Sequence, residues 1–177
     1  MRTVKLTGQI VALAAVAGLL GLLVWRLTHQ STPPKIGGPA PAFSSKRVDT
    51  GGTLDLASLR GKPVVLNFWA SWCGPCKRSF PWMNELAQRY GASGLTVVAV
   101  NVDKKRADAD RFLEATPAQF TVVYDAAGTT PAAWAVKGMP SSYLVDRSGR
   151  VVMVEQGFRD EQKAGVENRI RELLAAR

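Results

Sequence analysis

Two cysteines stand three positions apart in the run Trp72-Cys73-Gly74-Pro75-Cys76, and the 177-residue chain has no others. A disulfide stabilises a fold mainly by closing a loop of the unfolded chain, and a bridge at this spacing closes almost none. Structural zinc needs four ligands, whereas the sequence has no second cysteine pair and a single histidine, His29. The pair therefore favours dithiol–disulfide chemistry over its alternatives, a metal site or two unrelated buried cysteines.

The residues around the pair predict how one thiol becomes reactive. The apolar run 63–70 predicts a buried strand, and the helical spacing after Cys76 predicts a helix that extends to about Tyr90. Cys73 then lies at the helix N-terminus, where free N–H groups and the helix dipole favour a thiolate. We predict that Cys73 attacks a substrate disulfide and that Cys76, deeper on the same face, resolves the mixed disulfide.

Five neighbouring residues are assigned to substrate binding: Trp72, Gly74, Pro75, Met139 and Pro140. Gly74 adds no side chain, Pro75 fits a first helical turn, and Trp72 is expected to shape the rim of the site. Pro140 directly precedes a predicted strand, which by itself indicates only a loop proline. Beside a dithiol, a cis Met139–Pro140 bond would leave the Met139 backbone free to pair with an extended substrate segment.

The elements that must position these residues alternate along the chain. After a hairpin around Gly51 and Gly52, the patterns predict strands at 63–70, 95–103 and 120–125 and helices from the dithiol to Tyr90 and at 108–115. Thr130 is predicted to cap a short helix at 131–136, and two strands joined by a tight turn and a helix at 160–176 end the chain. This order predicts an α/β fold, a mixed sheet with helices on both faces and the dithiol at the carboxyl ends of its parallel strands.

The formal net charge is +9, but it is unevenly distributed. Residues 1–35 contain four Lys/Arg and no acid, so the remainder is only moderately basic. The one basic run, 104–106, is flanked by Asp103, Asp108 and Asp110, so we interpret it as a solvated loop and expect no nucleic-acid partner.

The N-terminal region carries a targeting signal. We divide it into a basic tail (1–9), an apolar transmembrane signal anchor (10–27) and a Pro/Gly-rich linker (28–41), followed by the domain at 42–177. The apolar run lies between Arg2 and Lys5 on one side and Arg26 on the other, and no small-residue cleavage site follows it. A cleaved signal peptide and a buried helix are the alternatives to an anchor.

Two stretches, NFWASWCGPC and GMPSSYLVDRSGRVV, resemble the active site and the cis-proline strand of the thioredoxin superfamily. Residues 37–177 resemble more narrowly its TlpA/ResA-type members, which are membrane-anchored thiol–disulfide oxidoreductases and include the cytochrome c maturation reductases. The resemblance implies a thioredoxin-like mixed central sheet flanked by helices, an N-terminal hairpin and a central βα insertion at 103–137. It also implies the cis proline and the role of Cys73 as nucleophile.

Two positions depart from the pattern of these families. Asn67 stands where thioredoxin has a buried carboxylate, and Ser79 stands where the TlpA-type proteins often have a Glu. We expect both to support the dithiol by orienting water or backbone, so another group must accept the Cys76 proton. Glu85 and Asp103 are the candidates.

The expected function is a disulfide reductase on the outer side of a bacterial cell membrane, single-pass, with no cofactor and no metal. Its expected partners are a disulfide-bearing protein, such as apocytochrome c or a copper-site protein, and a transmembrane electron donor. One alternative is a disulfide-forming oxidant. The other is a copper chaperone in which Met139 or Met153 adds to the two thiolates.

Overall fold

The computed structural model describes residues 14–24 and 34–176. The chain forms two units, which divide between Thr32 and Pro33. In the first unit, residues 14–24 are helical and expose apolar side chains such as Leu19 and Leu20. None of the helices in the described ranges combines the length and the apolar character that a membrane crossing requires. The predicted basic tail and parts of the predicted anchor and linker lie outside these ranges.

The second unit is built on one seven-stranded sheet in the order β2-β1-β5-β4-β3-β6-β7. Its strands are β1 (Ser44–Arg47), β2 (Thr53–Asp55), β3 (Val64–Trp69), β4 (Thr96–Asn101), β5 (Thr121–Tyr124), β6 (Ser141–Val145) and β7 (Val151–Gln156). β3, β4 and β5 are parallel, and the remaining pairings are antiparallel. The predicted mixed sheet and N-terminal hairpin are confirmed.

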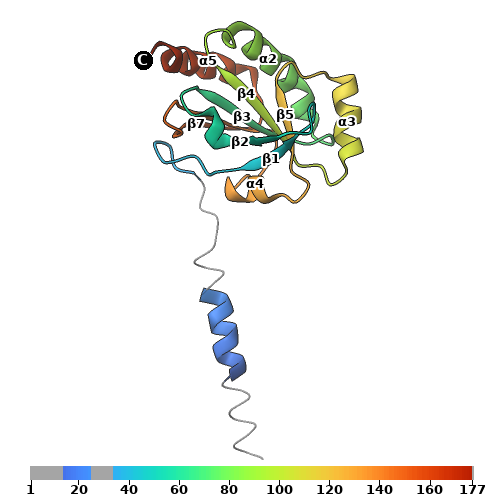
Figure 1. The fold of residues 1–177 in the computed structure, drawn as a ribbon, viewed down its shortest axis with the longest axis vertical. Coiled ribbons are helices and arrows are strands. Elements are labelled where there is room, and N and C mark those ends of the chain that lie inside the picture. Colours follow the sequence, from blue (N-terminus) through green and yellow to red (C-terminus); the bar gives the residue numbers. More distant parts are fainter. Residues whose placement is uncertain (1–13, 25–33, 177) are drawn as a thin grey trace, which may run out of the picture. The chain divides into compact units, whose positions relative to one another are not determined.

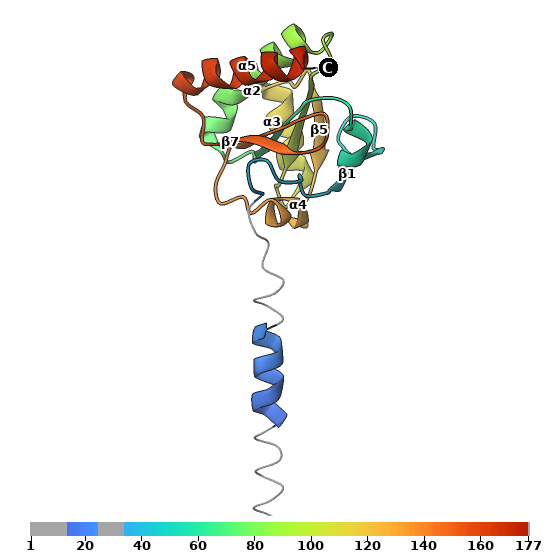
Figure 2. The same ribbon diagram turned by 90° about the vertical axis from the view of Figure 1, so that its left-hand side faces the viewer.

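Helices cover both faces of the sheet. They are η1 (Leu56–Leu59), α2 (Gly74–Tyr90), α3 (Arg106–Ala115), α4 (Thr129–Ala133) and α5 (Asp160–Ala175). Side chains of α2, α3 and α5 share one buried cluster with Val65, Trp69 and Ala99, while η1 and α4 lie by the other cluster, around Leu66, Phe68 and Trp134. Figures 1 and 2 show α2 and α5 together on one side of the sheet and α4 on the other.

β3 is the strand that positions the dithiol. All six of its side chains are buried, because α2 packs over one face and the second cluster covers the other. Its parallel neighbour β4 and antiparallel neighbour β6 hold it along its whole length. A strand fixed on both faces and both edges gives the next residues a rigid starting point.

Residues 37–40, which we predicted within the linker, are hydrogen-bonded to the domain. Gly37 N–H donates to Val151 O at 2.7 Å, Val151 N–H donates to Gly38 O, and Ala40 N–H donates to Gly149 O. Pro39 forms a β-bridge with Arg150. This segment therefore extends the sheet beside the beginning of β7.

The short helix α4 differs from its prediction. It begins at Thr129 rather than at Pro131, and its N-cap is Gly128, whose φ of +73° suits glycine. The capping acceptor is the side chain of Asp125, which receives the amide N–H groups of Gly128 and Thr130 at 3.0 and 2.6 Å. The Thr130-Pro131 pattern indicated the helix but not this carboxylate.

Candidate active site

The cysteine pair lies where β3 turns into α2. Cys73 is the N-cap of α2, and Gly74, Pro75 and Cys76 form the first turn. Cys73 N–H donates to Ala70 O at 3.1 Å, which holds the turn to the end of β3. The two cysteines are joined in a disulfide with their Cα atoms 5.3 Å apart.

The sulfur of Cys73 accepts a hydrogen bond from the helix itself. Cys76 N–H points at Cys73 Sγ with a donor–acceptor distance of 3.2 Å. The first N–H groups of a helix have no partner inside the helix, and they carry partial positive charge. This geometry can stabilise negative charge on Cys73 Sγ once the disulfide is opened.

The two cysteines differ in how far they can be reached. Cys73 is 4% exposed, whereas Cys76 is fully buried among Phe80 and the other members of the α2-side cluster. Gly74 and Pro75 are exposed beside them, and Trp72 is 71% exposed. An approaching partner therefore meets Trp72 and the first turn of α2, and it reaches Cys73 before Cys76.

The Met139–Pro140 peptide bond is cis, as the resemblance implied. The last pair of the β3–β6 ladder is Phe68 with Ser141, so the register brings Pro140 and Met139 alongside the residues that lead into Cys73. Within the described part of the chain, the Met139 N–H and C=O make no hydrogen bond, whereas Pro140 O accepts Gly157 N–H. Met139 thus presents a donor and an acceptor that a substrate backbone can use.

A hydrogen-bonded network next to the dithiol was missing from our assignment of roles. Asp103 is 3% exposed and accepts the Ser71 N–H and Ser71 hydroxyl, both at 2.9 Å, and the Asn101 amide at 2.7 Å. Asn101 ends β4, and Ser71 follows the end of β3, its parallel neighbour. Asp103, one of the two candidate proton acceptors, therefore anchors the turn two residues before Cys73. This contact could have been predicted from the sequence, because the carboxyl ends of neighbouring parallel strands lie side by side and bring the residues that follow them together.

Asn67, Ser79 and Glu85 take different places. Asn67 is buried and donates to Ser142 Oγ at 2.8 Å, while its Oδ1 has no partner among the described residues. Ser79 donates to Cys76 O at 3.0 Å, so it holds the backbone of the second cysteine. Glu85 lies exposed more than two turns further along α2, away from the pair.

An aromatic cluster packs next to the turn between β3 and α2. The Trp69 ring lies 4.8 Å from Phe80 and 4.6 Å from Phe112, and Phe80 and Phe112 are 4.9 Å apart, between centroids. These rings come from β3, α2 and α3, so the three elements that meet at the dithiol share one packed contact.

A carboxylate clamps α2 to α5. Glu167 accepts hydrogen bonds from Arg89 Nη2 at 2.7 Å, Tyr90 Oη at 3.2 Å and Trp82 Nε1 at 3.3 Å. Partial burial acts to raise the pKa of Glu167, but these donors outweigh it, and the pKa lies below its usual value. α2 is thereby held at its far end as well as at the cysteines.

No group of three or more His, Cys, Asp or Glu side chains in the described ranges is arranged to hold a metal ion.

The sequence profile of the Redoxin family matches residues 35–170. The chain belongs to the Redoxin family. Within this family, the chain is 31% identical over 150 residues to the thiol-disulfide oxidoreductase ResA of Oceanobacillus iheyensis, covering 83% of this chain and 78% of that protein. It is 36% identical over 126 residues to ResA of Bacillus subtilis, covering 71% and 69%.

Solved structures agree with this Redoxin assignment. A Chlorobium tepidum protein that carries the provisional name thiol:disulfide interchange protein DsbE is 46% identical, with a TM-score of 0.77 over 80% of this chain and 99% of that one. The structure of dsbF from MTB is 30% identical, with a TM-score of 0.66 over 74% and 94%. This Redoxin is a thiol–disulfide oxidoreductase of the thioredoxin superfamily and of the ResA/TlpA type, as the sequence predicted.

Proposed function

We propose that this chain reduces disulfides in protein substrates outside the cytoplasm, with Cys73 as the nucleophile and Cys76 as the resolving thiol. The observation that carries the proposal is the placement of Cys73 Sγ. It is the less buried of the two sulfurs, and it caps α2 by accepting the Cys76 N–H.

The proposed reaction transfers two electrons and two protons. In the reduced enzyme, the Cys73 thiolate attacks one substrate sulfur, a mixed disulfide forms, and the other substrate sulfur leaves as a thiolate that takes up a proton. Cys76 then loses its proton and attacks Cys73 Sγ, which forms the 73–76 disulfide and releases the second substrate thiolate for protonation. A disulfide between Cys73 and Cys76 is the enzyme product that this reaction would give.

The surroundings of the pair support each step. The Cys76 N–H and the first turn of α2 stabilise the thiolate on Cys73. Asp103 fixes the turn through Ser71, and Ser79 fixes the Cys76 carbonyl, so the two sulfurs keep a geometry in which they can bond. The unpaired backbone groups of Met139 can align an extended substrate strand beside them.

We place the domain on the outer side of a bacterial cell membrane, with residues 10–27 as the anchor. The sequence argument rests on Arg2 and Lys5 before an uninterrupted apolar run. A reductase in an oxidising compartment needs electrons from the other side, so a transmembrane donor is part of the proposal. Apocytochrome c during cytochrome maturation is the substrate we propose first, and a copper-site protein second.

The reduction potential tests the direction of the reaction. The full chain in detergent would be equilibrated against a thiol buffer of known potential, and the fraction of 73–76 disulfide would be measured. We expect a value near roughly −270 mV, the thioredoxin range. A value near roughly −120 mV would make the enzyme a disulfide-forming oxidant and would overturn the proposal.

Cysteine variants test the two roles. Cys76→Ser should accumulate a mixed disulfide with a substrate protein through Cys73, whereas Cys73→Ser should trap none. Non-reducing electrophoresis followed by mass spectrometry reads both outcomes. Trapping by Cys73→Ser alone would reverse the assignment.

A further inference from the structure

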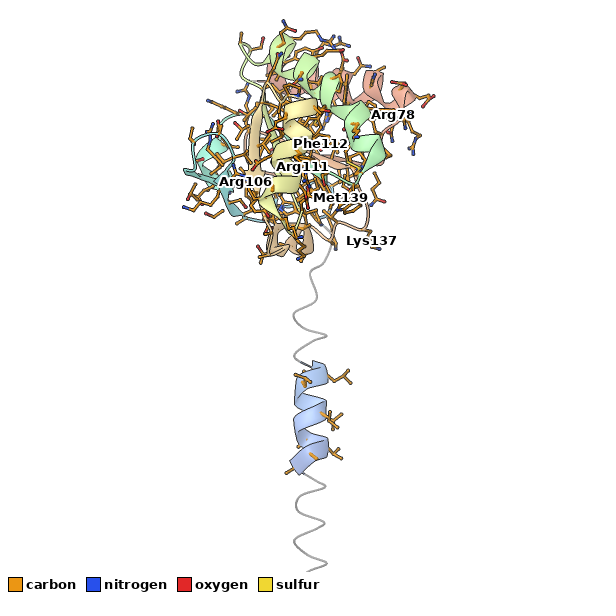
Figure 3. The ribbon with its side chains drawn as sticks, turned by 90° about the vertical axis from the view of Figure 1, so that its right-hand side faces the viewer. Arg78, Arg106, Arg111, Phe112, Lys137 and Met139 are labelled. Carbon is orange, nitrogen blue, oxygen red and sulfur yellow. A yellow bond between two sulfur atoms is a disulfide. The ribbon has the colours of Figure 1, made fainter. Side chains whose placement is uncertain are left out.

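Several cations come from the elements that carry or adjoin the dithiol turn. Lys77 and Arg78 follow Cys76 directly on α2, and Lys137 lies two residues before Met139 in the segment that leads into β6. Arg111 extends from α3. Figure 3 labels Arg78, Arg111, Lys137 and Met139 and shows them on the side of the domain that faces the viewer.

Three of these cations form no direct ion pair within the described residues. Within the described residues, Lys77, Arg78 and Lys137 form no ion pair or side-chain hydrogen bond, and all three are exposed. Some other cations of the domain are paired, such as Arg89 with Glu167, Arg106 with Asp110 and Lys163 with Asp160. Exposed cations without an ion pair therefore lie at the reactive end of α2 and in the loop beside it, as they also do elsewhere on the domain, for example at Lys62.

The nearby acids are paired with other groups or lie outside the groove. Asp160, at the start of α5, is paired with Lys163, and the charge of Arg78 also helps to lower the pKa of Asp160. Asp103 is buried and already accepts three donors, from Ser71 and Asn101. Asp108 is paired with Arg111 on α3. Glu114 is exposed on α3, but it is not among the residues that line the groove described next.

A groove opens between α2 and α3 next to the dithiol turn. Its volume is about 250 Å³, and its lining includes Ser71, Lys77, Arg111 and Phe112. Because Asp108 is the only acid in the lining and is held by Arg111, Lys77 is the free charge at this groove. The groove is large enough for a carboxylate side chain and offers it a cation at the edge.

Charges at the rim of a binding site mainly change the rate at which partners associate. A patch of one sign raises the association rate of partners of the opposite sign, and salt screens this effect over about 8–10 Å. Since Cys73 is the sulfur that a partner reaches first, cations around it select among partners before any bond is made.

We propose that the protein substrate of this enzyme presents its disulfide in an acidic segment, with carboxylates against Lys77, Arg78 and Lys137 and one of them at the α2–α3 groove. The inference rests on the proposed reductase function and names its substrate class. It requires no new chemical step, because the carboxylates only bind and the electrons pass through the sulfurs.

Two synthetic peptides test this inference. Both contain one internal disulfide in the same central sequence and differ only in the flanking residues, which are three Glu in one peptide and three Lys in the other. The reduced full chain in detergent should reduce the acidic peptide at least about tenfold faster at low ionic strength, and 0.5 M NaCl should bring the two rates together.

Charge-removing variants locate the effect. Lys77→Gln combined with Arg78→Gln should bring the ratio of the two rates to within about threefold, and adding Lys137→Gln should bring it close to one. The matched control is Lys35→Gln with Lys62→Gln, which removes the same charge. Lys62 precedes β3 at the end opposite the dithiol. The control should keep the full preference.

The outcomes separate this inference from the proposed function. Equal rates for the two peptides at low salt would overturn the acidic-substrate inference and leave the reductase standing. A preference that survives in the triple variant would also overturn it. Failure to reduce either peptide, with bis(2-hydroxyethyl) disulfide still reduced, would count against a protein-disulfide reductase altogether.

Discussion

Two neutral residues, Asn67 and Ser79, stand beside the dithiol. Asn67 keeps one amide hydrogen bond to Ser142 and one buried oxygen without a partner, and Ser79 holds the Cys76 carbonyl. Neither side chain titrates in the physiological range, so neither can take the Cys76 proton. They must therefore contribute by orienting other groups. Ser79 orients the Cys76 backbone, and Asn67 orients the Ser142 hydroxyl.

Removing either side chain should slow resolution without changing its pH dependence. We expect Asn67→Ala and Ser79→Ala each to lower the rate at which Cys76 resolves a mixed disulfide by about fivefold, the equivalent of one hydrogen bond of about 1 kcal/mol. The midpoint of the pH–rate curve should stay in place. Rapid-quench kinetics from pH 5 to 10 measures both quantities, and parent rates at every pH in both variants would disprove the hypothesis.

Asp103 should matter for both stability and rate. Asp103→Ala leaves the Ser71 amide and the Asn101 side chain without their buried acceptor, so we expect a loss of about 1–3 kcal/mol in the free energy of unfolding. Disulfide exchange should slow as well, because the turn before Cys73 loosens.

Urea unfolding and peptide reduction measure the two effects of Asp103→Ala. Asp110→Ala is the matched control, since its carboxylate forms only a solvent-exposed ion pair with Arg106. The control should stay within about 0.5 kcal/mol of the parent. An equal loss in both variants would show that the buried network has no special role.

At the scale of elements, local pattern predicted most of the architecture. The buried run of β3, the helix from the dithiol to Tyr90 and the antiparallel pair β6–β7 follow from side-chain periodicity and turn residues, which act over a few positions. The contacts that the sequence did not predict are those in which a side chain from one element bonds to another element. The Asp125 carboxylate caps α4 from the end of β5. Asp103, which follows β4, holds the turn between β3 and α2.

The clamp between α2 and α5 predicts an acid-sensitive contribution to stability. The folded pKa of Glu167 is depressed below 4.5, so its stabilising effect is full above about pH 4.5 and is lost as the pH falls through the folded value. Glu167→Gln should therefore unfold more easily than the parent at pH 7, by roughly 1–2 kcal/mol, and the difference should vanish at low pH.

Chemical denaturation of the parent and Glu167→Gln at pH 7, 5 and 3 tests this contribution. Glu172→Gln serves as the control, because Glu172 pairs only with Arg169 at the surface of α5. A difference that is constant across pH would mean that the Glu167 charge has no part in the clamp.

At the scale of the whole molecule, the structure places the start of the folded unit earlier than residue 42. Residues 37–40 add to the sheet beside β7, which is otherwise an edge strand. Composition alone favours a linker here, since Pro and Gly are frequent, and the pairing depends on a strand more than 100 positions away. Such a long-range contact has no local signature.

Two truncations test this boundary. A chain that begins at residue 34 should unfold at the same temperature as the full chain in the same detergent. A chain that begins at residue 42 should lose roughly 2–3 kcal/mol, because three backbone hydrogen bonds to residues 149 and 151 disappear. Equal stability of the two truncations would show that residues 37–40 only rest against the sheet.

The unequal burial of the two sulfurs has a kinetic consequence for the proposed reductase. A partner that delivers electrons and a partner that receives them must both bond to the same atom, Cys73 Sγ, because Cys76 is fully enclosed. The donor and the substrate cannot occupy the enzyme together, so turnover follows a ping-pong scheme in which each excludes the other. An excess of either partner would then inhibit the cycle, and the enzyme would work best when the supply of electrons and the supply of oxidised substrate are balanced.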